Sequence, residues 1–160
     1  KAIQSFTGLE HRLEILAEIN GVKYVNDSFG TTPETAIVAI KSFNQPKIMI
    51  VGGSDKGANF AELAQTIVSG NVKHLVGIGI MGPKILNTVK AYDAQKKVGM
   101  TLLDENTNMS QIVDTATKQA SKGDVILLST ACASFGMFEN YKQRGELFKQ
   151  AVQAIAGSAK

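Results

Sequence analysis

The sequence contains a single cysteine and no long apolar run, and these two shortages exclude whole classes of protein. Cys132 is the one cysteine among 160 residues, so the chain forms no internal disulfide and has no cysteine-based metal motif. No apolar run approaches the roughly 18 residues that a membrane-spanning helix needs. The first residues show no signal-peptide pattern. Together these observations predict a cytoplasmic protein without membrane insertion.

The chain also lacks a large excess of positive or negative charge. The formal net charge is +3, and the lysines and arginines are scattered along the chain. Proteins that bind nucleic acid usually carry a basic stripe, so we expect no nucleic acid as a partner. What the chain does have is an ordinary globular composition, 44% hydrophobic and 19% charged. Its length fits a single domain spanning 1–160.

Segments with the patterns of strands and of helices alternate along most of the chain. Strands are predicted over 48–51, 72–78, 98–103 and 124–128, and helices over 60–68, 83–92, 109–120 and 140–156. This alternation predicts an α/β, Rossmann-like fold with a mostly parallel, doubly wound sheet. The order of the strands is not readable from the sequence.

A β-hairpin is predicted ahead of this alternation. Asn20-Gly21 suits a tight turn because both positions need a positive φ. The apolar residues that alternate before the turn are Leu13, Ile15, Ala17 and Ile19. After the hairpin, Thr32 is the predicted N-cap of a helix that begins at Pro33.

Polar residues follow two of the predicted strands, where ligands bind in open α/β sheets. Asp27 and Ser28 precede a helix N-terminus, whose free N–H groups suit hydroxyls or negative charge. Alternatively, both side chains only satisfy the backbone of the turn. Thr31 is free to face a ligand if Thr32 is the cap. A loop of small residues over 129–134 follows the last strand and lets a ligand approach the backbone closely.

Two glycine-rich loops lack the spacing of known nucleotide motifs. Residues 52–57 resemble a phosphate cradle only loosely and do not match the P-loop. Residues 77–82 are one residue short of the dinucleotide fingerprint and are interpreted as a glycine turn before a helix. Lys56 is well placed to pair with a carboxylate or phosphate, although a solvated surface lysine is the more common case.

The remaining reactive residues are assigned structural roles. A catalytic cysteine needs a base, and neither His11 nor His74 has a motif that links it to Cys132, which is interpreted as a small packing residue. Arg144 is interpreted as a charged residue with a structural role near the start of the last helix. Four residues around the last loop are interpreted as core residues. They are Phe135, Met137, Phe138 and Tyr141. One of them, Tyr141, also has a hydroxyl that suits a ligand.

Together these segments resemble one family, the Mur ligases. The resemblance is carried by Gly8-Leu9-Glu10-His11-Arg12-Leu13-Glu14, by Asn20-Gly21-Val22 through Asn26-Asp27-Ser28, by residues 53–56, and by residues 129–134 with Phe138-Glu139-Asn140-Tyr141-Lys142-Gln143-Arg144-Gly145 and Phe148. It covers nearly the whole chain, in the same order, and corresponds to the C-terminal, amino-acid-binding domain of a three-domain enzyme. Within the family, the chain is most similar to the ligases that add D-glutamate.

The resemblance implies an ATP-dependent ligation in peptidoglycan precursor synthesis. ATP and Mg2+ convert the carboxylate of UDP-N-acetylmuramoyl-L-alanine to an acyl phosphate, and the amine of D-glutamate then displaces phosphate. This chain has no P-loop, magnesium cluster or UDP-sugar domain, so ATP, Mg2+ and the UDP-sugar are expected to bind mainly to other domains. No catalytic or metal residue is expected here, and the isolated domain is expected to be inactive.

The resemblance also implies roles for seven residues. D-Glutamate would be held by Thr31, Lys56, Ser134, Phe135 and Tyr141, with Phe135 offering its backbone N–H. Arg12 would reach the phosphates of the nucleotide and Asp27 the ribose hydroxyls.

Three positions depart from the family pattern. Phe29 stands where many members have Lys, Thr130 where Pro is common and Tyr141 where Phe is common. Two alternative functions stay open. One is a sister ligase that adds another amino acid, although the D-N-P-R signature of diaminopimelate- or lysine-adding members is absent. The other is a stand-alone Rossmann-like module for a nucleotide or other anion.

Overall fold

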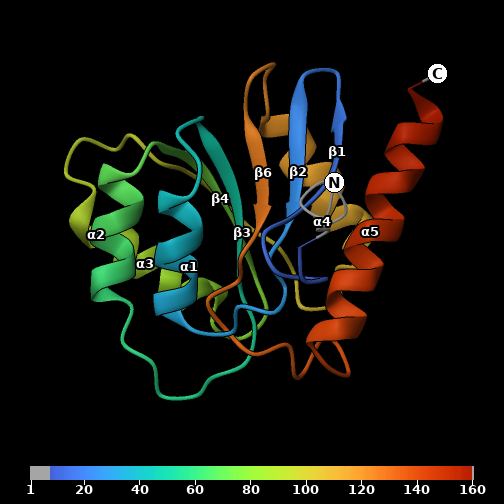
Figure 1. Ribbon diagram of the computed structural model, residues 1–160. Helices are drawn as coiled ribbons and strands as arrows, with labels where there is room; N and C mark the ends of the chain where they lie inside the picture. The colour runs from blue at the N-terminus through green and yellow to red at the C-terminus, as the bar shows by residue number, and fades with distance from the viewer. Residues whose placement is uncertain (1–7, 160) are drawn as a thin grey trace.

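The computed structural model describes residues 8–159 and is built around one six-stranded sheet (Figure 1). The segment 1–7, in which a targeting signal was sought, lies outside this range. The strands are β1 (Glu14–Ile19), β2 (Val22–Asn26), β3 (Lys47–Gly52), β4 (Val72–Ile78), β5 (Gly99–Leu102) and β6 (Val125–Leu128). The helices are α1 (Pro33–Lys41), α2 (Ala61–Ser69), α3 (Gly82–Tyr92), α4 (Met109–Gln119) and α5 (Tyr141–Ser158). Every predicted element is present, with small differences at the ends.

The sheet is mostly parallel, as predicted, and its strand order is β1-β2-β6-β3-β4-β5. β1 pairs antiparallel with β2, and the pairs β2–β6, β6–β3, β3–β4 and β4–β5 are all parallel. The last strand of the chain therefore lies between the second and the third. This insertion places the loop after β6 beside the loops that follow β2 and β3.

The predicted hairpin is confirmed, and a bulge changes which of its residues face the core. Asn20 and Gly21 both have a positive φ, 52° and 77°, as the turn requires. The register of β1 against β2 shifts between Ile15 and Ala17. The alternation expected from the sequence is therefore broken, Ile15 is 57% exposed, and the neighbouring Leu16 packs against the core instead.

Helices cover both faces of the sheet and enclose two apolar cores. Met49, Val51 and Leu127 point to the face covered by α1, α2 and α3. Ile48 and Ile126, each one position away, point to the face covered by α4 and α5. In Figure 1, α1, α2 and α3 lie to the left of the sheet, α4 lies behind β1 and β2, and α5 lies to the right. Strands buried on both faces explain the continuous apolar runs in the sequence.

The crossover connections change faces between β6 and β3. The chain leaves β3 toward α2 on one face and leaves β6 toward α5 on the other. Ligands bind at such switch points in open α/β sheets. The fold therefore marks the lower edge of the sheet in Figure 1, between β6 and β3, as the place for a site.

Candidate functional site

The loops that follow β3 and β6 are joined by backbone hydrogen bonds. Gly52 N–H donates to the Thr130 carbonyl at 2.9 Å, and Ser54 N–H donates to the Ala133 carbonyl at 3.0 Å. The Ser54 hydroxyl donates to the same carbonyl at 3.2 Å. Together these contacts fix the two loops against each other beyond the strand ends.

Two glycines make this close approach possible. Gly52 and Gly53 have φ values of 118° and 148°, which side-chain-bearing residues rarely adopt. A Cβ on Gly52 would overlap the Ile78 carbonyl oxygen, and one on Gly53 would overlap the Ala133 carbonyl oxygen. The glycine loop after β3 is thus required for backbone packing at the switch point.

Between these loops and the start of α1 lies a hollow of about 220 Å³, here called the central hollow. The polar and charged residues that line it include Thr31, Thr32, Glu34, Ser54, Lys56 and Asn59, with Ala131, Cys132 and Ala133 on the side of β6. Thr32 caps α1, accepting from Thr35 N–H at 3.3 Å. Thr31 is therefore not needed as the cap, as predicted, and it shares the central hollow with Lys56, whose side chain is exposed.

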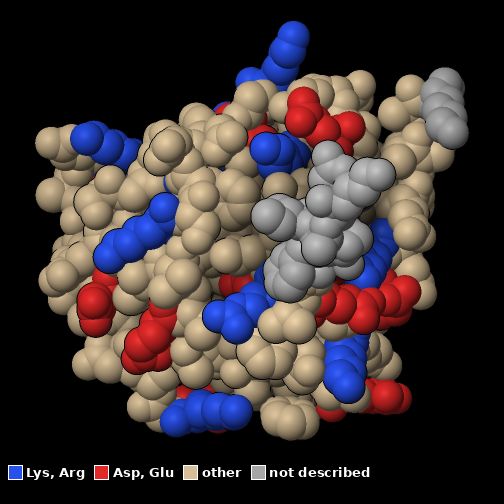
Figure 2. All heavy atoms as spheres, viewed as in Figure 1, with Lys and Arg blue, Asp and Glu red and all other residues tan. Residues whose placement is uncertain are grey.

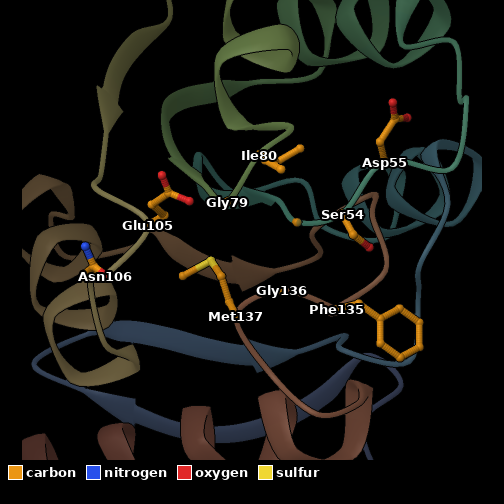
Figure 3. Close-up of a pocket in the computed structure, with 10 residues that line it drawn as sticks. Ser54, Asp55, Gly79, Ile80, Glu105, Asn106, Phe135, Gly136 and Met137 are labelled. Atoms are coloured by element: carbon orange, nitrogen blue, oxygen red, sulfur yellow. The ribbon is translucent and has the colours of Figure 1, made fainter.

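Ser134 and Phe135 follow the wall of the central hollow in the chain. Ser134 is buried, whereas Phe135 is 58% exposed, so the core interpretation of Phe135 is wrong. Met137 and Phe138 do pack partly against the core. Phe135 lines a second hollow of about 340 Å³, with Asp55 and Glu105 toward opposite ends of it (Figure 3).

Arg12 and Asp27 lie together in a third, more apolar hollow of about 260 Å³, here called the lateral hollow. Its other lining residues are Leu13, Phe29, Gly30, Glu34, Thr35, Val38 and Ala39. Arg12 is exposed and stands between two residues with positive φ, His11 at 63° and Leu13 at 45°. This backbone conformation is unusual for side-chain-bearing residues. It sets the direction in which the Arg12 side chain leaves the backbone.

Asp27 has a structural role as well as a place in the lateral hollow. One carboxylate oxygen accepts from Leu13 N–H at 3.1 Å and the other from the Ser129 hydroxyl at 2.8 Å. Burial raises the pKa of Asp27, opposed by these hydrogen bonds and by the charges of Arg12 and Arg144. Each carboxylate oxygen accepts about two hydrogen bonds, so the group retains capacity for a ligand.

Arg144 is the residue whose importance the sequence did not reveal. Its side chain is fully buried, and it donates to the Ser28 hydroxyl at 2.9 Å, the Ser28 carbonyl at 2.8 Å and the Cys132 carbonyl at 3.0 Å. Burial lowers the pKa of Arg144 to about 10. One guanidinium from α5 therefore ties the loop after β2 to the loop after β6. The sequence did not predict that Arg144 is buried, because this arginine lies in a polar stretch of residues.

The same contacts decide the roles of Ser28 and Cys132. Ser28 is fully buried and its hydroxyl donates to the Tyr141 carbonyl at 2.7 Å, which supports the structural interpretation of this residue. Cys132 is 3% exposed, and burial raises the pKa of its thiol to about 11. A thiol in this environment is a poor nucleophile, in agreement with its assignment as a packing residue.

Tyr141 begins α5 and is not among the residues that line the central hollow. Its ring contacts those of His11 and Phe29. The loops thus bring Thr31 and Lys56 into one hollow and Arg12 and Asp27 into another, with Phe29 and Tyr141 in contact near the second.

The described residues contain neither a metal-binding cluster nor a membrane-spanning helix. Within residues 8–159, no group of three or more His, Cys, Asp or Glu side chains is arranged to hold a metal ion. In the same range no helix has the length and apolar character needed to cross a membrane. Figure 2 shows basic and acidic side chains interspersed over the face in view.

Comparison with known proteins gives a single family. The model of the family described as "Mur ligase, glutamate ligase domain" matches residues 11–132. Three similar proteins are each named UDP-N-acetylmuramoylalanine--D-glutamate ligase. That of Lachnospira eligens is 45% identical over 96% of this chain and 32% of its own length. That of Thermoanaerobacter sp. (strain X514) is 42% identical over 96% and 33%, and that of Roseiflexus sp. (strain RS-1) is 41% identical over 97% and 32%. The chain spans about a third of the length of these relatives.

Proposed function

Because the chain belongs to the Mur ligase family, as its glutamate ligase domain, we propose that it is the amino-acid-binding domain of a cytoplasmic ligase that adds D-glutamate to UDP-N-acetylmuramoyl-L-alanine. The observation that carries the proposal is the central hollow, in which Thr31 and Lys56 lie together at the switch point of the sheet. This domain would present the incoming amino acid to the acyl phosphate formed elsewhere in the enzyme.

D-Glutamate carries two carboxylates and an ammonium group, and complementary groups are offered by the central hollow together with the loop after β6 and the start of α5. Lys56 would pair with a carboxylate, and the hydroxyls of Thr31 and Ser134 would donate hydrogen bonds to its oxygens. Two groups that do not line the central hollow would complete the site, with the backbone N–H of Phe135 as another donor and the ring of Tyr141 as an aromatic wall. Fixing the amine in the direction of attack is the main catalytic contribution that such a domain makes.

ATP would be contacted from the lateral hollow. Arg12 carries a permanent charge suited to phosphate, and Asp27 offers acceptor oxygens for ribose hydroxyls. Mg2+ would stabilise the negative charge of the transferring phosphoryl group. From the family resemblance, we assign the metal ion to another part of the ligase.

The decisive test is Lys56→Ala in the full-length ligase. Removal of a charge-assisted contact to a carboxylate, worth about 1.5–3 kcal/mol, should raise the Michaelis constant for D-glutamate about ten- to a hundredfold. The constant for ATP should change much less. The measurement is the initial rate of phosphate release, with D-glutamate, L-glutamate and lysine each tested separately as the amino-acid substrate.

Lys90→Ala, on the last turn of α3, is the matched control and should behave as the wild type. Unchanged kinetics for D-glutamate in Lys56→Ala would remove Lys56 from the site. Preference of the wild type for another amino acid would identify a sister ligase instead. Nucleotide binding without any ligation would favour the stand-alone module.

A further inference from the structure

Phe29 is a large apolar side chain that is 48% exposed, yet it is not loose on the surface. Its ring packs edge-to-face on the ring of Tyr141, with the centroids 5.3 Å apart and the planes at 88°. This is a favoured arrangement of two aromatic rings. Its backbone N–H also donates to the His11 carbonyl at 2.8 Å.

The ring of Tyr141 is bounded on a second side by His11. The two centroids are 6.2 Å apart and the planes are at 84°. His11 is 6% exposed, and its Nδ1 lies 2.9 Å from the amide nitrogen of Asn26. It also packs so closely on Gly145 that any Cβ there would overlap its ring. His11 is thus a fixed wall for the tyrosine ring.

The backbone of Tyr141 is held as well. Its carbonyl accepts from the buried Ser28 hydroxyl, and the preceding Asn140 caps α5 by accepting from Gln143 N–H at 2.9 Å. With the backbone and one neighbour fixed, the orientation of the Tyr141 ring depends on the half-exposed Phe29. Loss of the Phe29 ring would free Tyr141 to take other rotamers.

From this arrangement we propose that Phe29 is a positioning residue of the amino-acid site, which acts by holding the ring of Tyr141 in place. The inference rests on the proposed function, because it takes Tyr141 as a wall of the D-glutamate site. Phe29 itself lines the lateral hollow and is assigned no direct contact with D-glutamate. Its effect on the Michaelis constant for D-glutamate should therefore pass through Tyr141.

The test uses the full-length ligase and a double-mutant cycle. An edge-to-face pair favours the paired orientation of the Tyr141 ring by about two- to tenfold, which sets the size of the effect expected on D-glutamate binding. Phe29→Leu should accordingly raise the Michaelis constant for D-glutamate about two- to tenfold, with a smaller change in kcat. Phe29→Tyr keeps an aromatic edge and should restore the wild-type constant. In a Tyr141→Leu background, Phe29→Leu should have no additional effect.

Tyr92→Leu serves as the control, since Tyr92 is an exposed aromatic at the far end of α3. Thermal melts of all variants verify folding. An unchanged constant in Phe29→Leu, or additive effects of the two substitutions, would overturn the inference while leaving the proposed function intact. A wild-type ligase that does not use D-glutamate would instead refute the proposed function.

Discussion

Arg144 illustrates how much a single buried cation organises in this domain. Its guanidinium donates to one hydroxyl and two backbone carbonyls rather than to a carboxylate. Arginine suits this role because its donors form a rigid planar fork. The loops bearing Asp27 and Ser134 are therefore placed by a residue that faces neither proposed ligand. At the scale of the residue, Arg144 determines the geometry on which the site depends.

Arg144→Met should destabilise the fold by about 3 kcal/mol or more, because hydrogen bonds to charged groups contribute about 1.5–3 kcal/mol each and buried carbonyls would be left unpaired. Arg144→Lys keeps the charge without the fork and should fall between Met and the wild type. Urea unfolding followed by circular dichroism measures both. The exposed neighbour Lys142→Met is the control, expected to lie within about 0.5 kcal/mol of the wild type. A comparable loss in Lys142→Met would show that Arg144 has no special role.

At the scale of the element, the end of β3 is the most constrained segment of the site. The strand is buried throughout and stops at two glycines whose α-hydrogens face backbone carbonyls of the adjacent β4 and of the loop after β6. The strand end therefore cannot carry side chains without separating its neighbours. The polar residues of the loop begin only at Ser54, beyond this close packing.

Gly52→Ala should consequently cost about 3 kcal/mol or more, since about 1–2 kcal/mol of backbone strain adds to an overlap with a carbonyl. Gly57→Ala separates the two effects. Gly57 has a φ of 72° but open space where a Cβ would lie, so only the strain of about 1–2 kcal/mol is expected there. The measurement is the free energy of unfolding of each variant in urea. Equal losses in the two variants would argue against close packing at the end of β3.

At the scale of the whole molecule, the proposed function has the domain gather binding groups and leave the chemistry to the rest of a larger enzyme. The central and lateral hollows lie on one edge of the sheet, where another domain carrying ATP and the acyl phosphate would face them. A domain swinging onto its partner would complete the site.

The isolated chain should therefore show no ATP- and D-glutamate-dependent ligation of UDP-N-acetylmuramoyl-L-alanine. Phosphate release and product formation by mass spectrometry check this expectation, with the full-length ligase as the positive control. Turnover by the purified 160-residue chain would contradict it and would require a second ATP site in this domain.

Local sequence patterns determined the elements and supplied candidates for the site. Apolar periodicity placed the strands and helices, Asn20-Gly21 determined the hairpin, and Thr32 with Pro33 determined the start of α1. These features depend on residues a few positions apart, so the sequence displays them directly. The motifs also predicted the family, and the resemblance named Thr31 and Lys56 as candidates for the amino-acid site.

Only the tertiary structure decided which segments meet. Three contacts join residues about a hundred positions apart. They are the pairing of β6 between β2 and β3, the hydrogen bonds of Arg144 to Ser28, and the ring contact of Phe29 with Tyr141. The bulge that exposes Ile15 likewise depends on pairing with β2. Such contacts form because a whole sheet must bury both of its faces at once, and no local pattern of side chains encodes that condition.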